Sequence, residues 1–327
     1  MTANTPKRLL ALDILRGITI AGMILVNNPG SWGYVYTPLE HAAFNGLTPT
    51  DLVFPFFMFI MGISTYISLR KYNFTYSHAT LRKIVKRTVV IFCIGLFLNL
   101  LAKSVFTHHL NFEELRYLGV MQRLAIGYGV TSLVAITVKH KYFPAIILVT
   151  LAVYFLLLAM GDGFNLSATN IVARFDVWAL GTSHMYHDGG MAFDPEGLLS
   201  TLPAVCHVMV GFYCGKLLFS AKDNDEKIQR LFLVGTILTF AGFLLSYGCP
   251  INKKVWSPTF VITTCGLASS FLALLLGATG ASVFIYEKVL VPVLGNYPGS
   301  LAYALLYVLF CWSIVHILYK KGIYVKI

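Results

Sequence analysis

Long apolar runs alternate with short polar segments along the whole chain, and this pattern predicts membrane-spanning helices. A spanning helix needs about 20 mostly apolar residues. The stretch 281–295 is apolar but shorter, and Glu287, Lys288 and Pro292 interrupt it. We therefore expect an all-α fold, a polytopic integral membrane bundle of about nine or ten transmembrane helices, in one transmembrane domain over residues 1–327. The full-length candidates are 9–27, 52–69, 88–104, 117–138, 142–160, 198–219, 231–248, 258–279 and 299–319.

The composition agrees with this interpretation. Of the 327 residues, 57% are hydrophobic and 12% are charged, whereas soluble domains carry about 25% charged residues. Helices satisfy every backbone N–H and C=O within the segment, which a hydrocarbon core demands. The net charge of +11 comes largely from basic residues in short loops, and no aromatic and basic patch typical of a nucleic-acid binder is present. The expected partner is thus a lipid bilayer and not a nucleic acid.

The distribution of Lys and Arg predicts the orientation of the bundle. With the N-terminus inside, seventeen of these residues fall in inner segments and five in outer segments, as the positive-inside rule requires. The loop 28–50 then lies outside and the loop 70–87 inside. Nine spans would, however, place the basic C-terminal "YKKGIYVKI" outside. Either 281–295 forms a tenth span or a helix has been lost there.

Three polar residues of the first predicted helix share one face. Asp13, Arg16 and Asn27 recur with Ile20 and Met23 at spacings of three and four, which is the period of a helix. Charged side chains at membrane depth are costly and are therefore candidates for function. Alternatively, Asp13 and Arg16 form an ion pair that holds the helix in the bundle. The two interpretations are compatible.

The stretch "EHAAFNGLTPTDLVFPFFMFIMG" places His41, Asn45 and Asp51 directly before a long apolar run. Thr48 suits a helix N-cap, and Asp51 then falls at the third helical position, as in a capping box. Asp51 is thus either a helix cap or a functional acid, and His41 taken alone is typical of an interfacial loop. The loop 28–50 contains no Lys or Arg. Its aromatic residues suit either a membrane-interface belt or a sugar-binding surface: Trp32, Tyr34, Tyr36 and Phe44.

Five blocks of the sequence occur in the same order as in a known family. They are "LALDILRGITIAGMILVNNPG", "HAAFNGLTPTDLVFPFFMFIMG", "RYLGVMQRLAIGY", "FDPEGLLSTLPAV" and "INKKVWSPTF". Over most of 8–280 and 295–327, the chain resembles the bacterial branch of the heparan-alpha-glucosaminide N-acetyltransferase family. The resemblance implies acetyl transfer from cytosolic acetyl-CoA to the amine of a terminal glucosamine on the opposite side of the membrane. It also implies a bacterial inner membrane, with the N-terminus in the cytoplasm.

The resemblance assigns the catalytic positions to His41, Asn27 and Asp51. An amine that attacks a thioester must lose a proton, and histidine is a suitable general base near neutral pH. Asn27 would donate to the oxyanion of the tetrahedral intermediate, and Asp51 would hold the imidazole in its reactive tautomer. Direct transfer is favoured over an acetyl-histidine intermediate, because acyl-imidazoles hydrolyse readily and His41 lies near the wet outer face. The candidates for binding the acceptor are Asn45, Trp32 and Phe44.

Acetyl-CoA, the expected co-substrate, needs cationic contacts for its phosphates. Arg123 in "MQRL" lies inside a predicted helix, where the positive-inside rule gives no reason for a charge. The basic inner loop is a weaker candidate, since that rule accounts for it without CoA. The further cofactor-binding candidates are Arg16, Arg87 and Lys83. No metal is expected, because the six cysteines form no CxxC pair and two glycines directly follow "SHMYHD".

Two rival functions stay open. A transporter or flippase for an amino sugar or glycan would also need polar residues in a bundle. It would be expected to show inverted repeats, however, and no clear repeat is visible. O-acetylation of an envelope polysaccharide would differ only in the acceptor. The expected partners are thus acetyl-CoA, an amino-sugar or glycan acceptor, and a second copy of the chain in a homodimer.

Overall fold

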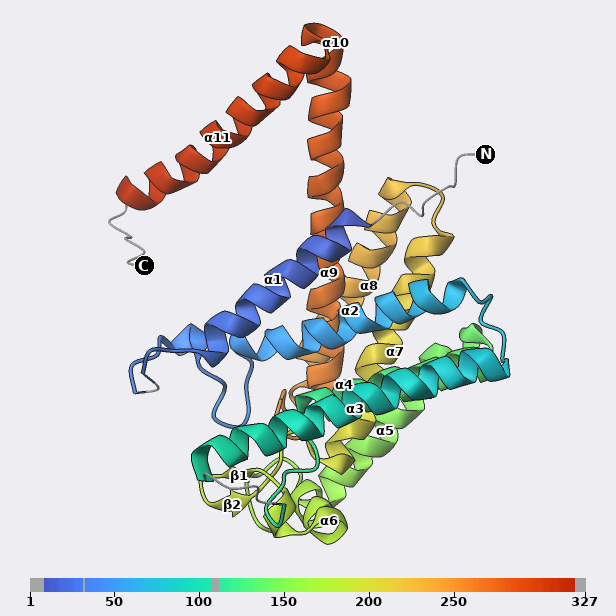
Figure 1. Cartoon of the computed structure of the whole chain (residues 1–327), viewed down its shortest axis with the longest axis vertical. Helices are drawn as coiled ribbons and strands as arrows, with labels where there is room; N and C mark the ends of the chain where they lie inside the picture. Colours follow the sequence, from blue (N-terminus) through green and yellow to red (C-terminus); the bar gives the residue numbers. More distant parts are fainter. Residues whose placement is uncertain (1–8, 32, 108–111, 321–327) are drawn as a thin grey trace. The chain divides into compact units, whose positions relative to one another are not determined.

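The computed structural model describes residues 9–31, 33–107 and 112–320. Helices follow one another along the chain, and the described strands form one small antiparallel hairpin (Figure 1). The helices are α1 (Leu10–Asn27), α2 (Thr50–Arg70), α3 (His78–Thr107), α4 (Val120–Thr137), α5 (Phe143–Met160), α6 (Ile171–Leu180), α7 (Leu198–Ser220), α8 (Asn224–Leu245), α9 (Pro258–Phe284), α10 (Val291–Leu294) and α11 (Asn296–Lys320). The shorter elements are η1 (Thr37–Leu39), η2 (His140–Tyr142), η3 (Thr182–His184), η4 (Ile285–Leu290), β1 (His187–Asp188) and β2 (Met191–Ala192).

The helices confirm the predicted fold class. Within the described residues, 8 helical stretches are long and apolar enough to cross a membrane. They correspond to α1–α5 and α7–α9, and each contains most of a span predicted from the sequence. The predicted span 299–319 falls within α11. The chain is therefore a polytopic helical membrane protein.

The stretch 281–295 does not begin a helix of its own. The chain continues from α9 through η4, which has π-helical geometry, into α10. Gly295 ends α10 with a φ of 81°, a conformation that glycine adopts at little cost. The predicted tenth span is thus a helical continuation of the ninth here, and the side on which the C-terminus lies stays a prediction.

The chain divides into two compact units, Met1–Ala273 and Leu274–Ile327. In the second unit, η4, α10 and α11 pack against one another. All of the polar clusters described below belong to the first unit. The prediction of a single transmembrane domain over 1–327 stays a prediction.

Helix α7 is the centre of the first unit and packs against α2, α4, α5, α6 and α8. Its closest approach is to α2, where two glycines meet. A Cβ atom on Gly62 would lie 2.1 Å from the carbonyl oxygen of Val208, and one on Gly211 would lie 2.2 Å from that of Phe59. Small residues let membrane helices approach this closely, and dispersion contacts then replace the hydrophobic effect as the attraction. The crossing fixes the position of the first turn of α2 relative to α7.

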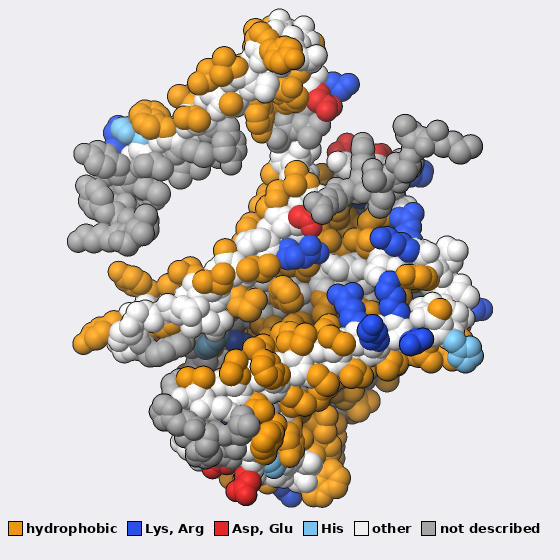
Figure 2. Space-filling model, viewed as in Figure 1, with side chains coloured by type: hydrophobic (Ala, Val, Ile, Leu, Met, Phe, Trp, Pro, Cys, Tyr) orange, Lys and Arg blue, Asp and Glu red, His pale blue; other side chains and the backbone are white. Residues whose placement is uncertain are grey.

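One end of the first unit gathers the starts of several helices. Arg123 in the first turn of α4 hydrogen-bonds to Ser200 in the first turn of α7. Asp176 of α6 accepts the N–H groups of Leu198 and Leu199 at 2.9 and 3.0 Å, and so caps α7. The predicted orientation makes this the outer end. Lys and Arg side chains instead gather where α2 ends and α3 begins (Figures 1 and 2), the predicted inner side.

Candidate functional site

Asp51 holds the imidazole of His41 at the outer start of α2. Its Oδ1 lies 2.7 Å from His41 Nδ1, and its Oδ2 accepts the backbone N–H groups of Ala42 and Thr48, each at 3.1 Å. The Thr48 bond is one half of the predicted capping box. One carboxylate therefore contacts the backbone before α2 with Oδ2 and the histidine with Oδ1, and a catalytic role of Asp51 stays a prediction.

The pairing determines which nitrogen of His41 can act as a base. Asp51 is buried, with 1% of its surface exposed, and a carboxylate only accepts hydrogen bonds. In the neutral form of the ring, Nδ1 then carries the proton and Nε2 carries the lone pair. About half of the His41 side chain is exposed. A neutral His41 would thus present its basic nitrogen at the predicted outer end.

Lys253 lies against the same pair, in the loop between α8 and α9. Its Nζ is 3.0 Å from His41 Nδ1, 3.4 Å from His41 Nε2 and 3.5 Å from Asp51 Oδ1. Burial lowers the pKa of Lys253, and the negative charge of Asp51 acts against that shift. The sequence interpretation had counted Lys253 only as one of the few positive charges outside. It is in fact the nearest cation to the candidate base among the described residues.

A buried asparagine joins the loop of Lys253 to the loop of His41. Asn252 is fully buried, and its Nδ2 donates to Asn45 Oδ1 at 2.9 Å. The backbone N–H of Gly46 donates to the carbonyl of Ile251 at 2.7 Å. Asn45 Nδ2 in turn donates to the carbonyl of Phe164 at 3.4 Å. These bonds give Asn45 a structural role, and its predicted contact with the acceptor stays a prediction.

Arg116 forms the opposite wall together with two acids that precede α7. Its Nε and Nη2 donate to the two carboxylate oxygens of Asp194 at 2.8 and 2.5 Å, and Nη2 also donates to Glu196 at 2.7 Å. Burial acts against the charge of Arg116, but the hydrogen bonds and charges of both acids outweigh it and raise the pKa. The N–H groups of Leu198 and Leu199 at the start of α7 bond to Asp176. Glu196 lines the cavity, and Asp194 is buried behind Arg116.

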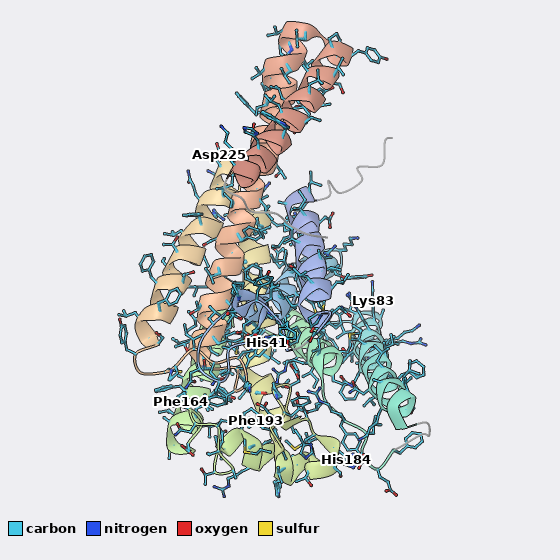
Figure 3. The ribbon with its side chains drawn as sticks, turned by 90° about the vertical axis from the view of Figure 1, so that its left-hand side faces the viewer. His41, Lys83, Phe164, His184, Phe193 and Asp225 are labelled. Atoms are coloured by element: carbon cyan, nitrogen blue, oxygen red, sulfur yellow. The ribbon has the colours of Figure 1, made fainter. Side chains whose placement is uncertain are left out.

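These groups surround a cavity of about 370 Å³, within the range of about 300–1,000 Å³ typical of ligand pockets. Figure 3 shows His41 between the helices and the loop region that carries Phe164, Phe193 and His184, with Lys83 apart from it on α3. Most of its charged side chains form ion pairs in the cavity wall, as in Arg116–Glu196 and Lys254–Asp188. The lining residues are His41, Ala42, Ala43, Asp51, Arg116, Tyr186, Asp188, Pro195, Glu196, Lys253 and Lys254.

A second hollow of about 470 Å³ shares Arg116 and Tyr186 with this cavity. The guanidinium of Arg116 lies 5.4 Å from the centre of the Tyr186 ring, and this pair separates the two hollows. Polar side chains such as Asn99 and Ser183 line the second one. The outer end thus offers room beyond the space next to His41.

Asn27 and Phe44 make their described contacts with residues other than His41. Asn27 Nδ2 donates to the carbonyl of Met23 at 2.9 Å, within its own helix, and Asn27 is not among the described residues that line the cavity. Phe44 packs edge-to-face on Phe193, with ring centres 6.1 Å apart. Trp32 lies outside the described residues. The predicted roles of all three stay predictions.

Arg123 is buried, with 1% of its surface exposed. Its Nη2 donates to the carbonyl of Gly197 and to the hydroxyl of Ser200, and its guanidinium lies 4.8 Å from the Trp256 ring centre. Its Nε and Nη1 have no hydrogen-bond partner among the described residues. A buried guanidinium with two unused donors fits a contact with a bound polar molecule. Arg123 lies in the first turn of α4, which the predicted orientation places at the outer end of the bundle.

The remaining cofactor candidates have partners within the protein. Arg16 bonds to Asp13 at 3.0 Å and to Ser64 at 3.1 Å, so the ion pair proposed from the sequence is present. Lys83 donates to the Tyr72 hydroxyl at 2.7 Å. The guanidinium of Arg87 lies 4.5 Å from the ring centre of Tyr128. Binding of CoA by these three cations stays a prediction.

The sequence interpretation missed Lys253, Arg116 and Glu196 as site residues. The signal was present, because each lies within a block that carries the family resemblance: "INKKVW", "RYLGV" and "FDPEG". Within the described residues, no group of three or more His, Cys, Asp or Glu could hold a metal ion.

The fold and the site together define a polytopic membrane protein with a cavity at one end whose wall carries acidic and basic side chains. Residues 8–249 match the model of a family described as heparan-alpha-glucosaminide N-acetyltransferase, catalytic, and the chain belongs to this family. It is 28% identical to the heparan-alpha-glucosaminide N-acetyltransferases of Mus musculus and of Homo sapiens. The matches cover 84% and 83% of this chain and 49% and 48% of those proteins. The chain thus spans about half the length of these relatives.

Proposed function

We propose that this protein transfers an acetyl group from acetyl-CoA, bound from the cytosolic side, to the amine of a glucosamine-type sugar at the outer side. The observation that carries the proposal is the His41–Asp51 pair, which lines an open polar cavity in a chain of an N-acetyltransferase family. Glu196 and Asp188 line the same cavity. Their carboxylate oxygens can accept hydrogen bonds from the neutral amine and the hydroxyl groups of a sugar.

His41 serves as the general base in this reaction. The acceptor amine attacks the carbonyl carbon of the thioester while Nε2 of His41 takes a proton from the amine nitrogen. Asp51 stabilises the imidazolium that forms, since its Oδ1 already accepts from Nδ1–H. The tetrahedral intermediate then expels the CoA sulfur, and His41 returns the proton to the thiolate. The products are an amide and a free thiol. General-base catalysis of this kind typically contributes about 10²–10⁴ in rate.

Direct transfer is preferred to an acetyl-histidine intermediate. The side chain of His41 is half exposed and lines an open cavity. An acyl-imidazole at that position would meet water before it met the amine, and it would hydrolyse. With both substrates bound together, the acetyl group stays on sulfur until the amine is in place.

Arg123 is proposed as a contact of the CoA molecule. It lies at the outer end of α4, and the basic end of α2 and α3 lies at the predicted inner side. A CoA molecule that enters from inside and delivers its thioester to His41 would bring its acyl end, rather than its phosphates, near Arg123. The amide carbonyls of the pantetheine arm are suitable acceptors for the two unused donors. The phosphates would then lie toward Lys83 and Arg87.

The test is acetyl transfer by purified protein in detergent or vesicles. Acetyl-CoA and glucosamine are supplied, and thiol release and the N-acetylated product are measured. His41→Gln should remove nearly all transfer and leave acetyl-CoA binding within about twofold, because Gln cannot act as a base. His78→Gln is the matched control, since His78 is exposed at the start of α3. A His41→Gln protein that keeps most of its rate would contradict the proposed role.

The acceptor series separates the rival functions. N-acetylglucosamine has no free amine, so its acetylation would indicate O-acetylation. Transport of amino sugar across vesicles without release of CoA would indicate a transporter. Mass spectrometry of protein held with acetyl-CoA alone separates the two mechanisms, because a stable acetyl adduct on His41 that glucosamine removes would establish the two-step route.

A further inference from the structure

Three cations line the cavity around His41, and they differ in their contacts with carboxylates. Arg116 bonds to both Asp194 and Glu196. Lys254 forms an ion pair with Asp188. Lys253 has only a long contact with Asp51 Oδ1, at 3.5 Å, and that oxygen already accepts from His41 at 2.7 Å. Among the described cations of the cavity, Lys253 is therefore the one whose donors are least used by carboxylates.

Lys253 also occupies a particular place beside the imidazole. Its Nζ lies within 3.4 Å of both ring nitrogens of His41. The in-plane directions of Nδ1 and Nε2 diverge, so one ammonium cannot lie along both. The in-plane direction of Nδ1 is taken by Asp51. The ammonium thus lies beside the ring, 3.0 Å from Nδ1 and 3.4 Å from Nε2, and off the in-plane direction of at least one of them.

The carbonyl oxygen of the reacting thioester needs a hydrogen-bond donor close to Nε2 of His41. The acceptor amine must lie at Nε2 to lose its proton, and the carbonyl carbon that it attacks lies within bonding reach of the amine. The carbonyl oxygen gains a full negative charge in the tetrahedral intermediate. A donor that stabilises it must lie close to Nε2, as Lys253 does. Asn27, to which the family resemblance assigns this task, donates one of its two amide hydrogens to the carbonyl of Met23 within α1, and its predicted role stays a prediction.

We propose that Lys253 is a catalytic residue whose ammonium donates to the oxyanion formed during acetyl transfer. The proposal rests on the proposed function. The amine lone pair forms the new C–N bond, and the carbonyl π electrons move to oxygen, where the ammonium of Lys253 donates to them. His41 takes the amine proton. The C–S bond then breaks with its electron pair on sulfur, the carbonyl re-forms, and the proton passes from His41 to sulfur. Lys253 stays protonated throughout.

The test uses Lys253→Met and Lys253→Arg in the full chain, with the acetylation assay. Lys253→Met keeps the length of the side chain and loses the charge. It should lower kcat by about 10²–10³, which is typical when an oxyanion donor is lost, while the dissociation constant for acetyl-CoA changes less than about threefold. Lys253→Arg should keep at least a tenth of kcat, because arginine still donates. A lysine that acted as a base would not be replaced by arginine, so an inactive Lys253→Arg protein that binds acetyl-CoA normally would overturn the assignment.

Chemical rescue separates the charge from the fold. Lys253→Cys should be inactive, and treatment with a methanethiosulfonate that carries an ethylammonium group should restore a large part of kcat. The methyl reagent, which adds no charge, should not. Treated wild-type protein controls for Cys93, which is exposed. If both reagents restored kcat, the charge would not be needed, and a role for the ammonium would be refuted. If neither reagent restored kcat while the protein still bound acetyl-CoA, the role would be refuted as well.

Two comparisons complete the test. Lys254→Met should reduce the rate much less than Lys253→Met, because Lys254 is paired with Asp188. Lys253→Met should also lower kcat more than Asn27→Ala does, because Asn27 already donates one amide hydrogen within α1, and the reverse order would overturn the assignment. A Lys253→Met protein as active as a competent wild type would overturn this inference alone. A wild type that acetylates no amino sugar would overturn the proposed function and this inference with it.

Discussion

Replacing Asp51 with asparagine should keep the fold and reverse the tautomer of His41. Asparagine has the same shape but only one acceptor oxygen. Oδ2 of Asp51 accepts hydrogen bonds from the N–H groups of Ala42 and Thr48 and from the Thr48 hydroxyl, at 3.1, 3.1 and 3.0 Å. Oδ1 meets His41 Nδ1. The single amide oxygen should therefore take the Oδ2 position, because each buried donor left without a partner costs about 1–3 kcal/mol.

The amide NH₂ of the variant would then face His41 Nδ1. Backbone N–H groups cannot change their protonation, but an imidazole can move its proton from Nδ1 to Nε2 and accept the new donor. The base at Nε2 is thereby lost. The same change in a Ser-His-Asp protease lowers kcat by about 10⁴, and we expect a loss of about 10³–10⁴ here, which corresponds to about 4–5.5 kcal/mol of activation free energy.

The assay measures kcat for acetyl transfer together with the dissociation constant for acetyl-CoA and the thermal midpoint in detergent. The dissociation constant and the thermal midpoint should change little, because the hydrogen bonds at the Oδ2 position are kept. Thr48→Val is the control. It removes one hydroxyl from the same carboxylate, leaves the tautomer unchanged, and should lower kcat by less than about tenfold. An Asp51→Asn protein with more than a tenth of the wild-type kcat would show that Asp51 is a helix cap and no more.

Three further predictions concern other parts of the molecule. Arg123→Ala should weaken acetyl-CoA binding by about 10–100-fold, as for loss of a buried charge-assisted contact, and unchanged binding in titration would exclude this role. Burial raises the pKa of Asp176 to about 6, so its contribution to the free energy of unfolding is fully present below pH 3.8 and is lost as pH rises through 6. The loss amounts to up to about 3 kcal/mol. Asp176→Asn should remove this pH dependence from unfolding curves measured between pH 4 and 7. Cysteines at Ser31 and Ser77 should react with an impermeant thiol reagent from opposite sides of the membrane, and labelling of both from one side would refute the topology.

The apolar runs predicted the membrane helices well because lipid and protein interior demand the same residues. The helix ends were less predictable. Helix α3 begins at His78 and α8 at Asn224, ten and seven residues before the predicted apolar runs at 88 and 231. Their first turns are polar, and hydropathy detects contact with lipid rather than helical backbone. Asp223 caps α8 by accepting the N–H of Glu226 at 2.8 Å, a local signal that an apolar window does not weigh.

Local signals also account for the part of the site that the sequence predicted. His41, Thr48 and Asp51 lie within eleven positions, so the capping box and the histidine pair can be recognised together. Lys253 lies 212 residues from His41, and Arg116 lies 78 residues from Asp194. Neither contact follows from spacing or periodicity, because the packing of α7 against its neighbours brings these loops together. A single sequence therefore indicates the proposed base and the acid that contacts it, but not the cations around them.

The bond between Asn45 and Asn252 has a consequence for the rate of each turnover. It fixes two loops that are 207 residues apart in the chain, and these loops carry His41 and Lys253. The conformational entropy of placing the two groups next to each other is lost once, when the chain folds, and not each time a substrate arrives. Reactions gain most when the reacting groups are already in position. Substrate binding then has only to align the thioester and the amine, and loosening this bridge would slow the chemical step more than it weakened binding.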